Sequence, residues 1–201
     1  MTDPISKVRD NALRSWEKLS NPRVLQHNLI VASLYLVAFE LLQSAVLDRL
    51  SSFFATEVEL TDSWRLKGKP NSRYSAEVLS FDPKYPLNAS CLWLVRNGVI
   101  SEAERLQIDA IRQHRNEVAH ELPVFVVEAD KAIDLGRLEQ IRALLLKIER
   151  WWILEVDVPT NPDFDGQNIV PDDVIPGPVM FLDFIIQTAA GPMPGQIADE
   201  A

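Results

Sequence analysis

The chain has 201 residues, 47% of them apolar and 24% charged, which is an ordinary balance for a soluble globular protein large enough to bury a core. Its formal charge of −9 does not exclude nucleic acid, because all 20 basic residues precede residue 157 and eight of the 29 acidic residues follow from there. The single cysteine, Cys91, excludes an internal disulfide. An N-terminus without the basic start and apolar core of a signal peptide predicts a cytoplasmic protein.

The first 55 residues predict two helices. Residues 4–19 form an amphipathic helix, and Pro22 starts a long, mostly apolar helix over residues 22–55. That helix is long enough to span a membrane, but its polar residues fall in one narrow strip. The strip indicates a central helix, buried on most sides or packed against a partner subunit, and no membrane span. Its members are Gln26, Ser33, Glu40, Ser44, Asp48 and Ser51.

Residues 56–87 predict irregular structure with a basic loop. The loop places four basic residues within nine positions, between two aromatic residues, a pattern that suits binding a phosphate backbone and stacking a base. The alternative interpretation is a solvated loop that its aromatic side chains fasten to the body. The candidate substrate-binding residues of the loop are Arg65, Lys67, Lys69 and Arg73. Residues 88–97 then predict a short helix that ends at Gly98 and holds Cys91 in the core.

The segment from residue 111 to 123 combines hydrogen-bond donors, an imidazole and a helix end. Ser101 and Glu104 predict a capping box at the start of this helix, and Pro123 predicts its end. The inward face is predicted to contain Ala103, Leu106, Ala110, His114 and Val118. The opposite arc is predicted to contain Arg112, Arg115, Asn116, Ala119 and His120. On this arc the Arg115 guanidinium and the His120 imidazole are predicted to flank a shallow notch over the small side chain of Ala119.

Arg115 and His120 suit phosphoryl chemistry that needs no metal. The imidazole transfers protons near neutral pH, the guanidinium is a charged fork for phosphate oxygens, and Asn116 can orient either group. A second interpretation stays open. A histidine is also favoured at a helix C-terminus by the macrodipole, and an arginine beside Glu117 and Glu121 can simply form surface ion pairs.

No metal or cofactor site is predicted. The three histidines show no metal-ligand spacing with cysteine or carboxylates, and His114 lies among apolar residues, as a core histidine does. The chain also lacks a glycine-rich phosphate loop and a serine-nucleophile elbow.

Beyond Pro123 the pattern changes twice. Residues 124–127, Val-Phe-Val-Val, predict a short β-like run, and Asp130 predicts the start of a helix to about residue 155. Residues 157–178 are rich in proline and acid, which predicts a linker or extended arm.

The C-terminal residues predict an appendage to the helical domain over residues 1–156. Residues 179–186 are apolar but too short to span a bilayer, so they bury on their own body or on a partner. The chain from Gly191 onward predicts a disordered end. The acidic arm over 157–201 can also compete with phosphate and mask the Arg115–His120 site.

The run from Arg115 to His120 resembles the signature of the HEPN superfamily: an arginine, a polar residue directly after it, and a histidine with four to six residues between. The surrounding order is similar as well. A long helix carries Tyr35 and Phe39-Glu40-Leu41, a variable insertion follows, and Gly98-Val-Ile-Ser-Glu leads into the helix that bears the motif.

This resemblance implies an all-α antiparallel bundle that dimerises so that two motifs face each other across a cleft. For active members it implies a metal-independent endoribonuclease of toxin–antitoxin or phage-defence systems. His120 would activate the ribose 2′-hydroxyl or protonate the leaving group, Arg115 would stabilise the phosphorane, and Asn116 would hold one of them. Arg112 and the basic loop would bind RNA.

The partners implied are a second copy of the chain, RNA, and an antitoxin or regulatory protein. Other members of the superfamily lack activity. The alternative is therefore a non-catalytic HEPN-like helical module that binds a protein or nucleotide, with the motif structural. The proline-rich arm is not part of the recognised pattern.

Overall fold

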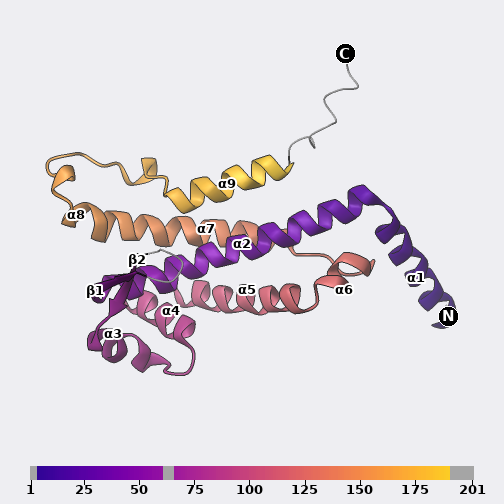
Figure 1. The fold of residues 1–201 in the computed structure, drawn as a ribbon, viewed down its shortest axis with the longest axis horizontal. Helices are drawn as coiled ribbons and strands as arrows, with labels where there is room; N and C mark the ends of the chain where they lie inside the picture. Colours follow the sequence, from indigo (N-terminus) through magenta and orange to yellow (C-terminus); the bar gives the residue numbers. More distant parts are fainter. Residues whose placement is uncertain (1–3, 61–65, 191–201) are drawn as a thin grey trace, which may run out of the picture.

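The computed structural model describes residues 4–60 and 66–190, and over these residues the fold is all-α with one small β-hairpin (Figure 1). The helices are α1 (Pro4–Ser20), α2 (Pro22–Phe53), α3 (Ser72–Glu77), α4 (Pro86–Arg96), α5 (Glu102–His120), α6 (Leu122–Val127), α7 (Leu135–Trp152), α8 (Val158–Thr160) and α9 (Gly177–Ala190), and the hairpin strands are β1 (Ala55–Leu60) and β2 (Leu66–Pro70). A π-helical turn, Ile153–Asp157, joins α7 to α8. The predicted all-α class is confirmed.

Helix α2 is the axis of the molecule. Figure 1 shows it running between α7 and α9 on one side and α4 and α5 on the other, and it packs against all four. Asn21 caps it by accepting hydrogen bonds from the backbone amides of Arg23 and Val24. Its buried residues are Ala32, Tyr35, Ala38, Phe39, Leu42, Ala45, Val46 and Leu50. Among the residues that the structure describes, it is the one helix long and apolar enough to cross a membrane.

Aromatic side chains lock α2, α4 and α7 together at one end. The Trp152 ring stacks on the Trp93 ring with 6.3 Å between centroids and an interplanar angle of 4°. Its indole N–H donates to the carbonyl oxygen of Ala45 at 3.1 Å. The stacked ring and the satisfied indole N–H together fix the orientation of α7 against α2.

Helix α5 is rotated from the prediction. Leu106, which was predicted to face inward, is 56% exposed, and Ala103 and Ala110 of the same predicted face are exposed too. Val118 is buried as predicted, but it shares the stripe that meets α2 with Ile108 and Ile111, which were not predicted to be buried. Arg115 lies between Ile111 and Val118 on this stripe, so it does not belong to the outer arc where it was predicted.

Three further predictions were wrong. Residues 56–87 are not irregular: β1 and β2 pair antiparallel, and α3 and a 3₁₀ turn follow. Residues 124–127 belong to α6, because Pro123 opens its first turn and the apolar side chains of Phe125 and Val126 are buried. The helix expected from Asp130 begins at Leu135, where the Asp134 side chain accepts the amide of Gly136.

The C-terminal apolar segment buries on its own body. Val179 and Leu182 of α9 are buried in the main core, against α2 and α7. Arg142 on α7 donates to both carboxylate oxygens of Asp183, at 2.5 and 2.7 Å. Burial and a bidentate ion pair therefore hold α9 along α7, as Figure 1 shows. Residues beyond 190, predicted to be a disordered end, lie outside the described residues.

Candidate functional site

Arg115 is anchored to α2. Its Nη2 donates to Oε1 of Glu40 at 2.5 Å, and its guanidinium lies 5.4 Å from the centre of the Phe39 ring. Its Nη1 donates to the amide oxygen of Asn116 at 3.4 Å. The ion pair and the ring fix the fork in one orientation. The side chain is nevertheless 31% exposed, so a cationic edge remains open to an anion.

One polar atom of the same side chain is not satisfied. Nε of Arg115 is buried and has no hydrogen-bond partner within the described part of the chain. A buried donor without an acceptor is unfavourable.

His120 is the last residue of α5 and is exposed. His120 lies five positions after Arg115, which on an ideal helix amounts to about 7.5 Å along the axis and about 140° around it. Ala119 is exposed between them. Within a single copy the imidazole and the guanidinium therefore point in different directions.

His114 has a structural role in the core. Its side chain is almost buried, its Nε2 accepts the backbone amide of Asp134 at 3.4 Å, and its Nδ1 lies 3.3 Å from Glu117. The ring meets Tyr35 and Phe125 edge-on. The prediction of a satisfied core histidine is confirmed.

The basic loop is separate from the motif. Lys69 lies 4.0 Å from Glu57 across the hairpin, and Arg73 donates to Glu77 at 2.9 Å. Both follow the C-terminal end of α2, whereas α5 ends near α6 at the other end of the molecule (Figure 1). A single copy therefore does not bring these cations to His120. Of the other two, Arg65 lies outside the described residues, and of Lys67 only the backbone, in β2, is described.

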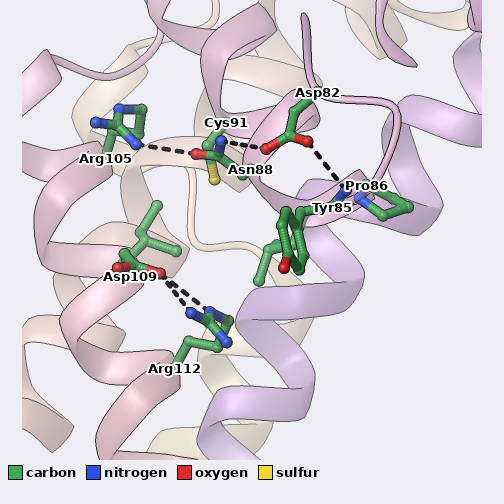
Figure 2. A pocket seen from close by; sticks show the side chains of 10 residues that line it. Asp82, Tyr85, Pro86, Asn88, Cys91, Arg105, Asp109 and Arg112 are labelled. Atoms are coloured by element: carbon green, nitrogen blue, oxygen red, sulfur yellow. Dashed lines mark hydrogen bonds and ion pairs between the residues drawn. The ribbon is translucent and has the colours of Figure 1, made fainter.

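A cavity of about 370 Å³ lies where the start of α4 meets α5, and the sequence interpretation missed it (Figure 2). Arg112, predicted to bind substrate, is one of its lining residues. The lining also contains Asp82, Tyr85, Pro86, Leu87, Asn88, Cys91, Arg105, Ile108 and Asp109. Arg105, Asp109 and Arg112 are spaced i, i+4 and i+7, a signal in the sequence for one continuous polar face.

The polar groups of the cavity are held by one another and by two neighbours on α5: Arg105 also pairs with Glu102, and Asp109 also accepts from Gln113. Arg105 donates to the Asn88 amide oxygen at 2.9 Å, and the Asn88 amide donates to Asp82 at 2.8 Å. On the α5 side, Arg112 donates through two nitrogens to one oxygen of Asp109, at 3.0 and 2.8 Å. These hydrogen bonds hold the pKa of the Asp109 carboxyl below its usual value despite partial burial. Asp109 is therefore an anion at neutral pH.

Cys91 lies at the inner side of this cavity and is buried. Burial raises the pKa of its thiol to about 12. A thiol that stays protonated is a poor nucleophile, so the side chain acts as apolar lining, in keeping with the core position predicted for it.

The outer face of α5 links the cavity to the motif. Arg112, Asn116 and His120 follow one another at intervals of four residues, so their side chains line one side of the helix. Arg115 flanks this line on the side toward α2. Across the described ranges, 4–60 and 66–190, no three His, Cys, Asp or Glu side chains come close enough to hold a metal ion.

Comparison of the chain with family models, with curated proteins and with solved structures found no match.

Proposed function

We propose that the protein is a HEPN-like, metal-independent endoribonuclease that acts as a cytoplasmic homodimer. The observation that carries this proposal is the state of Arg115. Glu40 and Phe39 hold its guanidinium in place, and 31% of the side chain is open to solvent. Such a fixed, partly exposed cation, about one and a half turns before an exposed histidine, suits a phosphate that gains charge during reaction.

The reaction proposed is internal transesterification of RNA. Neutral His120 accepts the proton of a ribose 2′-hydroxyl while the 2′-oxygen attacks the adjacent phosphorus. The bond to the 5′-oxygen breaks, and that oxygen takes a proton from an imidazolium. The products are a 2′,3′-cyclic phosphate and a 5′-hydroxyl. Arg115 stabilises the charge on the phosphorane, and Asn116 keeps the guanidinium in place through its amide oxygen.

Arg115 and His120 point in different directions within one copy, and a homodimer can bring an arginine and a histidine together from two copies. If two α5 helices face each other, His120 of the partner subunit can lie opposite Arg115 of the first copy. The two imidazoles then serve as base and acid for the same phosphate. An antitoxin or regulatory protein that binds this face would block the site, as expected for a toxin or phage-defence component.

The second candidate is a non-catalytic helical module, and the Arg115–Glu40 pair favours it in one respect. The pair joins α5 to α2 across 75 positions of sequence, which is also what a structural cross-link does. In that case substitution of Arg115 lowers stability and there is no activity to lose.

Cleavage of a mixed RNA by the purified protein in EDTA separates these candidates. We expect cleavage by the wild type, and a loss of at least about 100-fold in His120→Ala and Arg115→Ala because general acid–base and phosphorane stabilisation are removed. His27→Ala, an exposed histidine on α2, is the matched control and should keep full activity. Circular dichroism and gel filtration establish that each variant folds. Cleavage retained in both motif variants, or absent from the wild type, contradicts the proposal.

A further inference from the structure

A second cleft, of about 460 Å³, lies at the end of the molecule away from His120. Three elements enclose it: the second half of α2, the end of α7 with the π-helical turn that follows, and the start of α9. Figure 1 shows these three elements at the same end of the fold. A π-helical turn is rare, and such turns are frequent at functional sites. The cleft is therefore a second place to look for a ligand.

Glu149 is a buried carboxylate in this cleft. Its side chain is 7% exposed, and Arg49 is the one cation that pairs with it within the described part of the chain. That guanidinium is shared, because Nη2 of Arg49 lies 3.4 Å from Glu149 but donates to Asp157 at 2.7 Å. Burial raises the pKa of the Glu149 carboxyl, and the charge of Arg49 does not offset this, in part because Asp157 acts in the opposite direction. The negative charge of Glu149 is thus incompletely neutralised.

The cleft as a whole is anionic. Its lining contains three carboxylates, those of Asp48, Glu149 and Asp157, and Arg49 is the one cation among the described residues that line it. An anionic ligand would be repelled. The carboxylates also do not converge on one point, since no three His, Cys, Asp or Glu side chains in residues 4–60 and 66–190 come close enough to hold a metal ion. The distribution suits a cation whose own charge is spread over several groups.

The oxygen atoms on the α2 side follow a line. Ser44, Asp48 and Ser52 are spaced at intervals of four residues, so they lie along one side of the helix over about 12 Å. Apolar residues complete the lining, namely Ile153, Pro176 and Pro178. A linear polyamine has the matching pattern, because its ammonium groups alternate with methylene chains that can pack on an apolar surface.

We propose that this cleft binds a linear polyamine of about the length of spermidine. One ammonium group donates to Glu149, another donates to Asp48 on α2, and the methylene chains between them pack on Ile153 and the proline rings. The ligand supplies the positive charge that Arg49 does not supply. A cleft of 460 Å³ is within the usual size of small-ligand sites. This site is separate from the proposed nuclease site and does not depend on it.

Isothermal titration of the full-length protein with spermidine, without RNA and at physiological ionic strength, tests the proposal. We expect one spermidine per chain. Asp48→Asn changes an exposed carboxylate and Glu149→Gln changes the buried one, and each should weaken binding by about tenfold or more, because a charge-assisted hydrogen bond is lost. Glu139→Gln removes the same charge from the exposed surface of α7 and should leave binding unchanged. Circular dichroism establishes that each variant folds.

Two further ligands test the length and the source of the alkylammonium groups. Putrescine is too short to reach both carboxylates and should bind about tenfold more weakly than spermidine or worse. If a lysine-rich peptide binds more tightly than spermidine and Glu149→Gln abolishes that binding, the cleft is a docking site for a protein and the polyamine proposal is overturned. It is also overturned if spermidine does not bind, if Asp48→Asn and Glu149→Gln bind it undiminished, or if Glu139→Gln weakens it equally.

Discussion

One carboxylate determines how Arg115 is presented. Glu40 holds the guanidinium by a short ion pair, yet Glu40 itself is 54% exposed and Arg115 is 31% exposed. Water screens such a pair, so it contributes little to the stability of the fold. Its value for a nuclease lies in orientation, because a fork fixed before the substrate arrives does not have to be ordered during the reaction.

Glu40→Gln should therefore separate catalysis from stability. The glutamine keeps the length of the side chain but loses the charge, so we expect the free energy of unfolding to change by less than about 1 kcal/mol. The kcat for RNA cleavage should fall by about 10-fold to 100-fold, with little change in KM, because the guanidinium is less well placed. Glu139→Gln on exposed α7 surface is the control. A Glu40→Gln enzyme with normal kcat shows that the ion pair does not position Arg115.

The start of α5 is fixed by a local cap and a long-range contact. The Ser101 hydroxyl accepts the amide of Glu104, and the Glu104 carboxylate accepts the amide of Ser101. The same carboxylate accepts two hydrogen bonds of 2.8 Å from Lys147 on α7. One side chain therefore caps the helix and joins α5 to α7.

The pH dependence of stability should reveal this double role of Glu104. Burial alone would raise the pKa of its carboxyl, but the hydrogen bonds from Lys147 and Ser101 leave the pKa below the usual value. A pKa that is lower in the folded state contributes stability above the ordinary pKa of glutamate, and this is lost as the pH falls through the folded value. Glu104→Gln should thus destabilise the protein by about 1 kcal/mol at pH 7 and by less at pH 3. A difference that stays constant between these two pH values contradicts this account.

Features that depend on interactions between neighbours in the sequence could be predicted, whereas features that depend on long-range packing could not. The cap of α5 and the break at Pro123 depend on neighbours in the chain, and both are where the spacing predicts them. The buried face of α5 depends on α2. Val118 belongs both to the predicted inward face and to the face that is buried in the structure. The buried face includes Ile111, whose carbonyl oxygen accepts a hydrogen bond from the Tyr35 hydroxyl, 76 positions away in the sequence. The periodicity of α5 alone does not determine which of the two faces packs against α2.

The same division applies to the site. The positions of Arg115 and His120 on one helix end were predictable from their spacing. The partner of Arg115 was not, because Glu40 lies in another helix and its pairing follows from how α5 docks on α2. The cavity joins residues from 82 to 112 across the α4–α5 junction, so only the spacing on α5 was visible in the sequence.

The whole molecule is organised in two layers that share α2. One layer contains α4 and α5 with the candidate site, and the other contains α7 and α9 (Figure 1). Leu182 of α9 is fully buried in the same core as Trp93 and Trp152. Because α9 packs against α2 and α7, loss of a buried side chain in α9 should also destabilise the packing of the aromatic cluster at the end of α2.

Leu182→Ala should therefore destabilise the whole protein. Loss of a buried leucine and the resulting cavity should lower the free energy of unfolding by about 2–5 kcal/mol. Phe184→Ala, in the same helix but 65% exposed, should change it by less than about 0.5 kcal/mol. Urea unfolding followed by tryptophan fluorescence and by far-UV circular dichroism should give coincident transitions that shift together in Leu182→Ala. If the tryptophan transition keeps its midpoint in that variant, α9 unfolds as a separate unit and its packing does not support the layer that holds Arg115.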